Sequence, residues 1–211
     1  MFDLANFGSV LFDVDDTLVA SSKLHENAFL ETIIEFKIEA NFSYSEFSGM
    51  TTKKVFEAMG FSNSKLEALV FRKQEIASDL LTCAEAMPGA LEILKFLKSE
   101  NKAIYTVSSG SKRNVQKSLV AAGLWDYIID SVSSEDVRNG KPDPECYLLA
   151  LSRFNIDPKR VFAIEDSIAG CNSAISAGIQ VIGVSKSSTL PSTDQFPELT
   201  HLLFELRKQR K

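Results

Sequence analysis

The sequence SVLFDVDDT at residues 9–17 is the most informative segment for predicting the fold of this chain. Its first four residues are apolar or small, without polar alternation, which is typical of a strand buried inside a parallel sheet. The strand leads directly into Asp13 and Asp15, whose side chains are expected to project toward the same side. Two adjacent carboxylates repel each other, so this position predicts a compensating cation or a bound proton.

Further apolar runs follow in the C-terminal part of the chain, and helical patterns separate them. The runs cover residues 103–107, 127–132, 161–164 and 180–184, and the helical patterns cover residues 90–98, 115–120, 146–154 and 168–177. This alternation of strands and helices predicts a parallel sheet with right-handed crossovers. Residues 185–196, which include Ser187, Ser188 and Pro191, are interpreted as a surface loop.

The pattern differs between the first strand and residue 90. Residues 23–82 contain helical patterns and no convincing strand, and they are too long for an ordinary crossover. We therefore predict an α/β fold in which an all-helical cap domain is inserted into the chain. The Rossmann-like parallel-sheet core is expected to comprise residues 1–18 and 86–211, and the cap residues 19–85.

The composition is that of a globular protein without an extreme charge. Its 211 residues are 45% hydrophobic and 24% charged, and the formal net charge of −5 argues against nucleic-acid binding. Cys83, Cys146 and Cys171 form no CxxC pair and indicate reduced thiols. No apolar run reaches the ~20 residues of a membrane span, and no signal-peptide pattern is present. We expect a cytoplasmic protein without nucleic-acid or membrane partners, and a monomer and a weak homodimer remain equally open.

Polar residues also follow the other expected strands. Hydroxyls and backbone N–H groups after the run at residues 103–107 suit an anion such as phosphate. A lysine lies within GKPDP at residues 140–144, and two carboxylates follow the run at residues 161–164. Carboxylate oxygens are the ligands that Mg²⁺ prefers. The residues concerned are Ser108, Ser109, Gly110, Lys141, Glu165 and Asp166.

These motifs resemble, in order and in spacing, those of the haloacid dehalogenase-like superfamily. The resemblance covers essentially the whole chain and includes residues 13–17, Ser108, Lys141 and residues 165–167. The helical insertion after the first motif is similar to the cap of the branch that contains phosphoglycolate phosphatase and β-phosphoglucomutase.

The resemblance implies a role for each motif residue. Asp13 would be the nucleophile, Asp15 would be the acid and base, and Thr17 would orient Asp15. The phosphoryl group would be held by Ser108 and Lys141, with Ser109, Gly110 and His25 as further substrate contacts. The Mg²⁺ ion would be held by Asp13, Asp15 (through its backbone carbonyl), Glu165 and Asp166.

The chain also departs from the family pattern. Asp16 stands where the family commonly has glycine, and we interpret it as a turn residue without a catalytic role. His25 lies where this branch often has a histidine, and a functional and a structural role are both open. Residues 47–51 resemble the substrate-facing loop of the cap, but the arginine of the mutase is missing near them. For Lys53 and Lys54, contact with substrate stays open, and a solvated helix face is the favoured interpretation.

The pattern as a whole predicts a Mg²⁺-dependent phosphatase that hydrolyses a small phosphorylated metabolite through an aspartyl-phosphate intermediate. A carboxylate nucleophile splits hydrolysis into two easier steps, and phosphoryl transfer depends mainly on positioning and charge neutralisation. Two alternatives remain. One is a sugar-phosphate phosphomutase of the β-phosphoglucomutase type, and the other is a non-catalytic phosphate-binding protein on the same scaffold.

Overall fold

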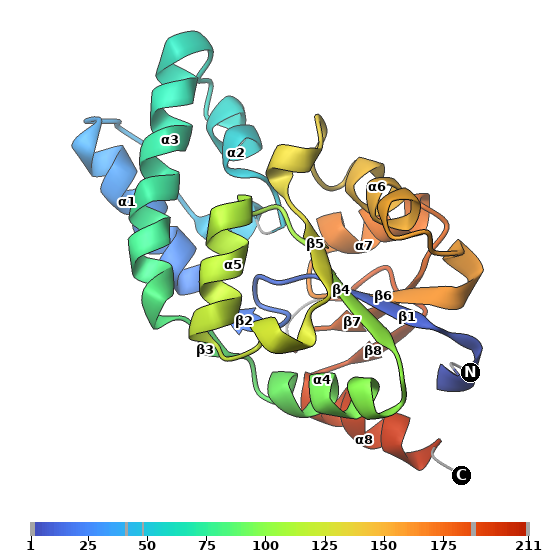
Figure 1. Cartoon of the computed structure of the whole chain (residues 1–211). Helices are drawn as coiled ribbons and strands as arrows, with labels where there is room; N and C mark the ends of the chain where they lie inside the picture. Colours follow the sequence, from blue (N-terminus) through green and yellow to red (C-terminus); the bar gives the residue numbers. More distant parts are fainter. Residues whose placement is uncertain (1–2, 41, 48, 187–188, 210–211) are drawn as a thin grey trace.

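Figure 1 shows the chain as a computed structural model, which describes residues 3–40, 42–47, 49–186 and 189–209. A parallel sheet forms the middle layer, helices cover both of its faces, and a separate group of helices lies beyond the carboxyl ends of its strands. The α/β class with an inserted helical cap, predicted from the sequence, is therefore confirmed.

The described residues form a six-stranded sheet with the order β5-β4-β1-β6-β7-β8, in which all paired strands are parallel. The strands are β1 (Ser9–Phe12), β4 (Ala103–Val107), β5 (Asp130–Val132), β6 (Val161–Glu165), β7 (Gln180–Val184) and β8 (Asp194–Phe196). Because β1 lies between β4 and β6, the strand order reverses beside it, where ligands bind in open α/β sheets.

Two strand predictions need correction. The run at residues 127–132 forms a strand only at its end, because Trp125–Tyr127 is a turn of 3₁₀ helix. The expected loop at residues 185–196 contains β8, which pairs with β7. An edge strand of three residues is too short to show a hydrophobic period. Ser187 and Ser188 of that loop lie outside the described residues.

Four of the described helices flank the sheet at the positions that the apolar patterns predicted. They are α4 (Ala90–Ser99), α5 (Lys112–Ala121), α6 (Glu145–Arg153) and α7 (Ile168–Ser176). A further helix, α8 (Leu199–Lys208), was not among the predicted patterns. Short 3₁₀ helices lie at Leu4–Asn6, Tyr44–Phe47, Leu81–Cys83, Trp125–Tyr127, Ser134–Asp136 and Pro158–Arg160.

Both faces of the sheet are buried, which explains why the sequences of its strands are continuously apolar. On β1, Val10 and Phe12 pack into one core together with α4, α5 and α8. Leu11, which points to the opposite face, packs into a second core with α6 and α7. The strand period of two thus distributes one short sequence between two cores.

The helices beyond the carboxyl edge form a cap with an apolar core of its own. They are α1 (Ser22–Glu35), α2 (Thr52–Ala58) and α3 (Asn63–Leu80). Phe29 of α1 packs against Phe56 of α2 with ring centroids 5.3 Å apart, and Leu69 of α3 completes the cluster. The division of the chain at residues 18/19 and 85/86 stays a prediction.

The two connections between cap and core lie side by side. β2 (Val19–Ala20) pairs antiparallel with β3 (Glu85–Ala86), so both connections pass through one short ribbon. This ribbon could not be predicted from the sequence, because two residues are too few for a periodic pattern.

Asp16 ties the core to the first cap helix. Its backbone is left-handed, with φ of 60°, and its Oδ1 accepts hydrogen bonds from the backbone of Ser21 at 3.1 Å and of Ser22 at 3.0 Å. Ser21, the residue before α1, makes no side-chain cap of its own. Asp16 therefore caps α1 from a distance, in agreement with the interpretation of Asp16 as a structural turn residue.

Cys146 and Cys171 are buried free thiols packed as small apolar groups beside α6 and α7, and Cys83 is an exposed free thiol. Within the described ranges, no helix combines the length and the apolar character that crossing a membrane needs.

We predict that Asp16→Ala lowers the free energy of unfolding by about 2 kcal/mol, the upper range for a lost helix cap. Asp16→Asn, which keeps an oxygen acceptor and tolerates a positive φ, should cost less than half as much. Urea denaturation followed by circular dichroism measures both. Equal stability of Asp16→Ala and the unmodified protein would contradict the capping role.

Candidate active site

The polar residues expected at the strand ends lie together at the carboxyl edge of the sheet. Asp13 follows β1, Ser108 follows β4, and Glu165 is the last residue of β6. These three strands are neighbours, so their ends are adjacent. Lys141 enters from the turn before α6, and its Nζ lies 2.6 Å from Asp13 Oδ1 and 2.6 Å from Glu165 Oε1.

The ammonium group of Lys141 occupies the centre of the buried part of the site. The residue is 1% exposed and donates hydrogen bonds to Asp13, to Glu165 and, at 3.0 Å, to the backbone oxygen of Val107. An ammonium group has three protons, so these acceptors use all of them. A phosphoryl oxygen that binds Lys141 must therefore replace one of the three acceptors.

Negative charge exceeds positive charge around Lys141. Burial alone would lower the pKa of Lys141, but Asp13 and Glu165 raise it above its ordinary value. Burial raises the pKa of Asp13, although Lys141 opposes this shift. The carboxylates of Glu165, Asp166 and Asp15 add to the increase. Lys141 alone does not balance the carboxylates of Asp13, Glu165 and Asp166, so this part of the site favours further positive charge.

Tyr147, which the sequence marked only as part of an apolar helix, fixes the position of Glu165. Its buried hydroxyl donates to Glu165 Oε1 at 2.5 Å. Gly170 leaves the room that this carboxylate needs, because a Cβ atom there would lie 1.9 Å from Glu165 Oε2. Lys141, Tyr147 and Gly170 thus hold Glu165 in one place.

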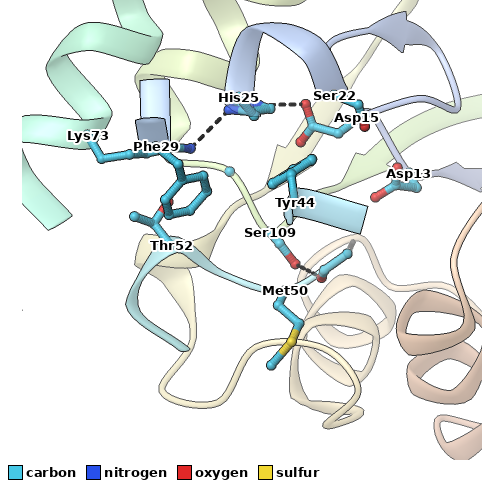
Figure 2. A pocket seen from close by; sticks show the side chains of 12 residues that line it. Asp13, Asp15, Ser22, His25, Phe29, Tyr44, Met50, Thr52, Lys73 and Ser109 are labelled. Carbon is cyan, nitrogen blue, oxygen red and sulfur yellow. Dashed lines mark hydrogen bonds and ion pairs between the residues drawn. The ribbon is translucent and has the colours of Figure 1, made fainter. Parts of the chain in front are cut away.

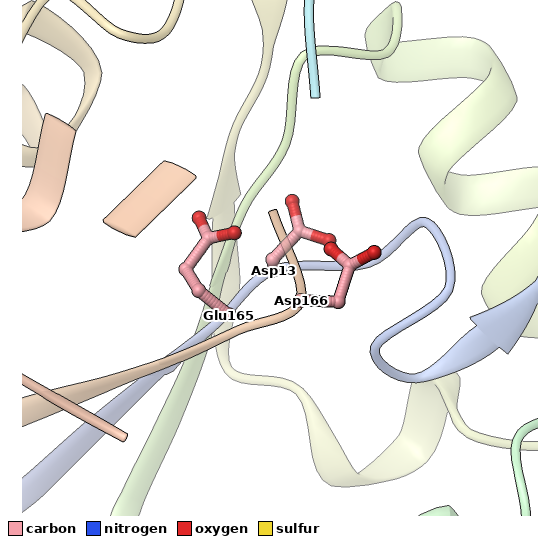
Figure 3. A group of neighbouring side chains, drawn as sticks. All are labelled: Asp13, Glu165 and Asp166. Atoms are coloured by element: carbon pink, nitrogen blue, oxygen red, sulfur yellow. The ribbon is translucent and has the colours of Figure 1, made fainter. Parts of the chain in front are cut away.

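Asp13, Glu165 and Asp166 form a group that fits a metal ion (Figure 3). One side-chain oxygen from each lies within 4.8 Å of the others. Glu165 Oε2 is buried and has no hydrogen-bond partner among the described residues. Burial and the neighbouring Glu165 raise the pKa of Asp166. Carboxylate oxygens crowded in this way suit a hard divalent cation such as Mg²⁺.

The side chain of Asp15 is held from the cap side instead (Figure 2). Asp15 Oδ1 accepts a hydrogen bond from the hydroxyl of Ser21 at 2.6 Å and lies 3.0 Å from His25 Nε2. Ser108 Oγ donates to Asp15 Oδ2 at 3.4 Å. Contact between the Asp15 backbone carbonyl and a metal stays a prediction.

Thr17 occupies a different place from the one that the resemblance implied. Its hydroxyl donates to Asp166 Oδ1 at 3.5 Å rather than to Asp15. Ser21 and His25 orient Asp15 instead. Thr17 therefore supports the metal-site carboxylate, and the orienting residues come from the start of the cap.

His25 belongs to a hydrogen-bonded chain that ends at Lys73 of α3. His25 Nδ1 lies 3.0 Å from Lys73 Nζ, which also lies 4.4 Å from the centre of the Phe29 ring. A protonated Lys73 can only donate to Nδ1, which leaves the histidine proton on Nε2, facing Asp15. His25 and Lys73 thus share one positive charge beside the carboxylate of Asp15.

Lys73 was missed in the sequence, although α3 carries a signal for it. Lys73 is 4% exposed and lies at helical spacing among the buried residues Leu66, Leu69 and Ile76. A lysine on the apolar face of a helix is rarely buried without a partner. The missing information was the partner, which lies 48 residues away in the chain.

This chain of residues changes two pKa values. Burial alone would raise the pKa of Asp15, but the positive charge shared by His25 and Lys73, together with the hydrogen bonds of His25 and Ser21, lowers this pKa below its ordinary value. Burial lowers the pKa of Lys73 to about 8, and Asp15 partly opposes this shift. Asp15 is therefore ionised in this arrangement.

The expected phosphate contacts Ser109 and Gly110 are engaged within the protein. Ser109 Oγ donates to the backbone oxygen of Gly49 in the cap at 2.7 Å, as Figure 2 shows. The backbone N–H of Gly110 donates to Ser108 Oγ at 2.9 Å. Contact of Ser109 and Gly110 with phosphate stays a prediction.

A narrow cavity of about 30 Å³ separates the cap from the carboxylates (Figure 2). Asp13 and Asp15 line its core side, and the cap contributes Phe29, Tyr44 and Met50. A space of this size holds water and is too small for a sugar phosphate. Met50 belongs to the expected substrate-facing loop, of which Ser48 lies outside the described residues.

A carboxylate beside a buried lysine, with an acidic group that fits Mg²⁺, has the layout of a phosphoryl-transfer enzyme. Residues 10–184 match the haloacid dehalogenase-like hydrolase family. The chain belongs to this family.

Named relatives and solved structures agree with this assignment. The phosphorylated carbohydrates phosphatase of Thermotoga maritima is 32% identical over 183 residues, which are 82% of this chain and 83% of the relative. The β-phosphoglucomutase of Bacillus subtilis is 26% identical over 198 residues, 88% of this chain and 87% of the relative. The structure of β-phosphoglucomutase from Clostridium difficile matches with a TM-score of 0.87 at 20% identity and covers 96% of both chains, which supports the fold.

We predict that Lys73 makes the stability of the protein depend on pH. The unfolded chain keeps this proton up to about pH 10.5, whereas the folded protein loses it near pH 8, so stability rises with pH between these values. Lys73→Met lacks this contribution. The unfolding free energy of the unmodified protein relative to the variant should therefore increase by roughly 2–3 kcal/mol across this range.

Urea denaturation at several pH values between 7 and roughly 10.5 measures this difference. Lys65→Met, which changes an exposed lysine of the same helix, is the matched control and should show no such trend. A constant difference between Lys73→Met and the unmodified protein would contradict the buried, partly neutralised state of Lys73.

Proposed function

We propose that this protein hydrolyses the phosphate monoester of a small carbohydrate, with Mg²⁺, through an aspartyl-phosphate on Asp13. The observation that carries the proposal is the contact of Lys141 with Asp13 and Glu165, because it places a cation where a carboxylate must approach a phosphate. The activity named for the relative from Thermotoga maritima supports the class of substrate.

The first half-reaction uses Asp13 and Asp15. Lys141 binds Oδ1 of Asp13, which leaves Oδ2 for attack on phosphorus. A bond forms between Asp13 and phosphorus, and the bond from phosphorus to the ester oxygen breaks. Asp15 gives its proton to that oxygen, so the alcohol leaves neutral.

The second half-reaction returns the enzyme to its starting state. Asp15, now ionised and held by Ser21 and His25, removes a proton from a water molecule that attacks phosphorus. The bond between Asp13 and phosphorus breaks, and inorganic phosphate leaves. The low pKa of Asp15 in the present arrangement suits this second role, whereas the negative charge of a bound phosphate ester would favour the protonated form needed first.

Asp13, Asp166 and Glu165, together with the backbone carbonyl of Asp15, are the groups that would hold Mg²⁺. A bound divalent cation supplies charge neutralisation between the carboxylate nucleophile and the anionic substrate. Thr17 keeps Asp166 in place for this purpose.

A phosphomutase is the second candidate. The position of His25 beside Asp15 and the similarity to the mutase of Bacillus subtilis favour it. A mutase must hold a sugar bisphosphate, and its second phosphate needs a cation in the cap. The basic residues lining the cavity in the described cap are His25, which contacts Asp15, and Lys73, which contacts His25. Hydrolysis therefore has the stronger support.

We predict that the purified protein releases phosphate from monophosphates of sugars or sugar alcohols, and that chelation of Mg²⁺ removes the activity. Asp13→Asn should lower kcat by at least about 10⁴-fold, because it removes the nucleophile. A phosphate-release assay over a panel of esters measures both effects, with circular dichroism to establish that the variant is folded. Release that survives Asp13→Asn would point to another nucleophile.

We also predict that a monophosphate is preferred to the corresponding bisphosphate. Glucose 6-phosphate should have a kcat/KM at least about ten-fold above that of glucose 1,6-bisphosphate, because a second phosphate in the cap would lack a cation. Thr52→Arg, which adds a cation to the cavity wall, should narrow the difference. Preference for the bisphosphate, or isomerisation of glucose 1-phosphate, would favour the mutase.

A further inference from the structure

The cap segment at residues 49–54 touches the core beside each of three catalytic motifs. Ser109, next to Ser108, donates its hydroxyl to the Gly49 backbone oxygen at 2.7 Å. A Cβ atom on Gly49 would lie 2.5 Å from the hydroxyl of Ser167, the neighbour of Asp166. The third contact, with the turn that carries Lys141, is made by a charged side chain.

That side chain is Lys54 of α2. Its Nζ donates to the backbone oxygen of Gly140 at 2.6 Å and lies 3.4 Å from the backbone oxygen of Lys141. The interpretation of Lys53 and Lys54 as one solvated helix face is therefore wrong for Lys54. Lys53 is exposed and lies 3.8 Å from Glu57 of its own helix, whereas Lys54 points across the boundary between cap and core.

The contact depends on a close approach of the two backbones. A Cβ atom on Gly140 would lie 2.3 Å from the methyl carbon of Thr51, so a side chain at residue 140 would push the cap away. Thr51 accepts the backbone N–H of Lys54 at 3.3 Å and caps the start of α2. Thr51 therefore fixes the turn from which Lys54 extends.

The same turn carries Lys141, whose ammonium group is held on several sides. Lys141 places its ammonium group among three acceptors, so a shift of its backbone would change its contacts with both Asp13 and Glu165. A charged donor on two carbonyl oxygens gives a stronger hydrogen bond than a neutral one. The cap contact is thus suited to hold the Lys141 turn when the cap is closed.

We propose that Lys54 is a positioning residue that couples closure of the cap to the placement of Lys141. In the open state, Lys54 leaves the two carbonyl oxygens and the Lys141 turn loses this restraint. In the closed state, the turn is fixed while the cavity is small enough to exclude bulk water. The effect on turnover rests on the proposed phosphatase activity, whereas the effect on cap closure does not.

The first test compares Lys54→Met with the matched control Lys53→Met. Lys54→Met should lower kcat/KM by about ten-fold to a hundred-fold, the factor expected for one charge-assisted hydrogen bond. Lys53→Met should stay within about two-fold of the unmodified protein. Lys54→Arg, which keeps a donor of similar reach, should recover most of the loss.

The second test adds a methyl group at residue 140 and removes one from residue 51, on the two sides of the same contact. Gly140→Ala should lower kcat/KM, because the added methyl group meets Thr51. Addition of Thr51→Ser to Gly140→Ala should restore activity, since the methyl group of Thr51 is removed and its Cβ would lie 3.6 Å away, an ordinary contact. Local damage to the Lys141 turn would not be repaired by a change in the cap.

A third measurement needs no substrate. Small-angle X-ray scattering of the free proteins should give a larger radius of gyration for Lys54→Met and Gly140→Ala than for the unmodified protein and Lys53→Met. Equal scattering and equal kcat/KM for Lys54→Met and Lys53→Met would overturn the proposal, as would failure of Thr51→Ser to rescue Gly140→Ala. If Lys54→Met does not fold, the comparison of Gly140→Ala with the double variant Gly140→Ala/Thr51→Ser tests the proposal.

An unmodified protein that is inactive on every phosphate ester would overturn the proposed function and leave the scattering comparison as the test of Lys54.

Discussion

The buried ammonium group of Lys141 is the interaction on which the rest of this structure depends. A charge without partners in the interior costs several kcal/mol, so Lys141 can be buried only where carboxylates surround it. Asp13 and Glu165 satisfy that condition because β1 and β6 are neighbours and both end at the same edge. The order of the strands and the chemistry of the site are therefore one constraint. Asp166 extends the negative charge beyond what a single lysine balances, which creates the place for a divalent cation.

The cap supplies a second set of contacts, and these reach the other half of the machinery. Asp13, the proposed nucleophile, is held within the core. Asp15, the proposed acid and base, is held by Ser21 at the start of the cap and by His25, which Lys73 contacts in turn. Opening of the cap would separate Asp15 from that shared positive charge. It would also remove the contact of Lys54 with the turn that carries Lys141, whose ammonium group binds Asp13. Closure thus acts both on Asp15 and on the surroundings of Asp13.

Much of this arrangement could be read from the sequence. Strands buried in a parallel sheet are continuous apolar runs in the sequence, so the bounds of β1, β4 and β7 agree with the predicted ones. The polar residues that follow such runs identified the site residues of the core. Three features escaped, each for a physical reason. Strand β8 is too short to show a hydrophobic period. The same holds for the antiparallel ribbon of β2 and β3. The partners of Lys54, Lys73 and Tyr147 depend on contacts between segments that are distant in the sequence. A buried lysine on an apolar helix face was visible as a pattern, but its partner was not.

The proposed mechanism requires that Asp13 carries the phosphoryl group during turnover, and trapping of that covalent intermediate is the decisive experiment. The enzyme would be mixed with a substrate carrying a radioactive phosphoryl group, quenched in acid within one turnover, digested and mapped by mass spectrometry. The proposed role of Asp13 as nucleophile predicts a hydroxylamine-sensitive label on the peptide that contains Asp13. A label on a different residue, or rapid turnover with no label on the protein under any quench time, would contradict it.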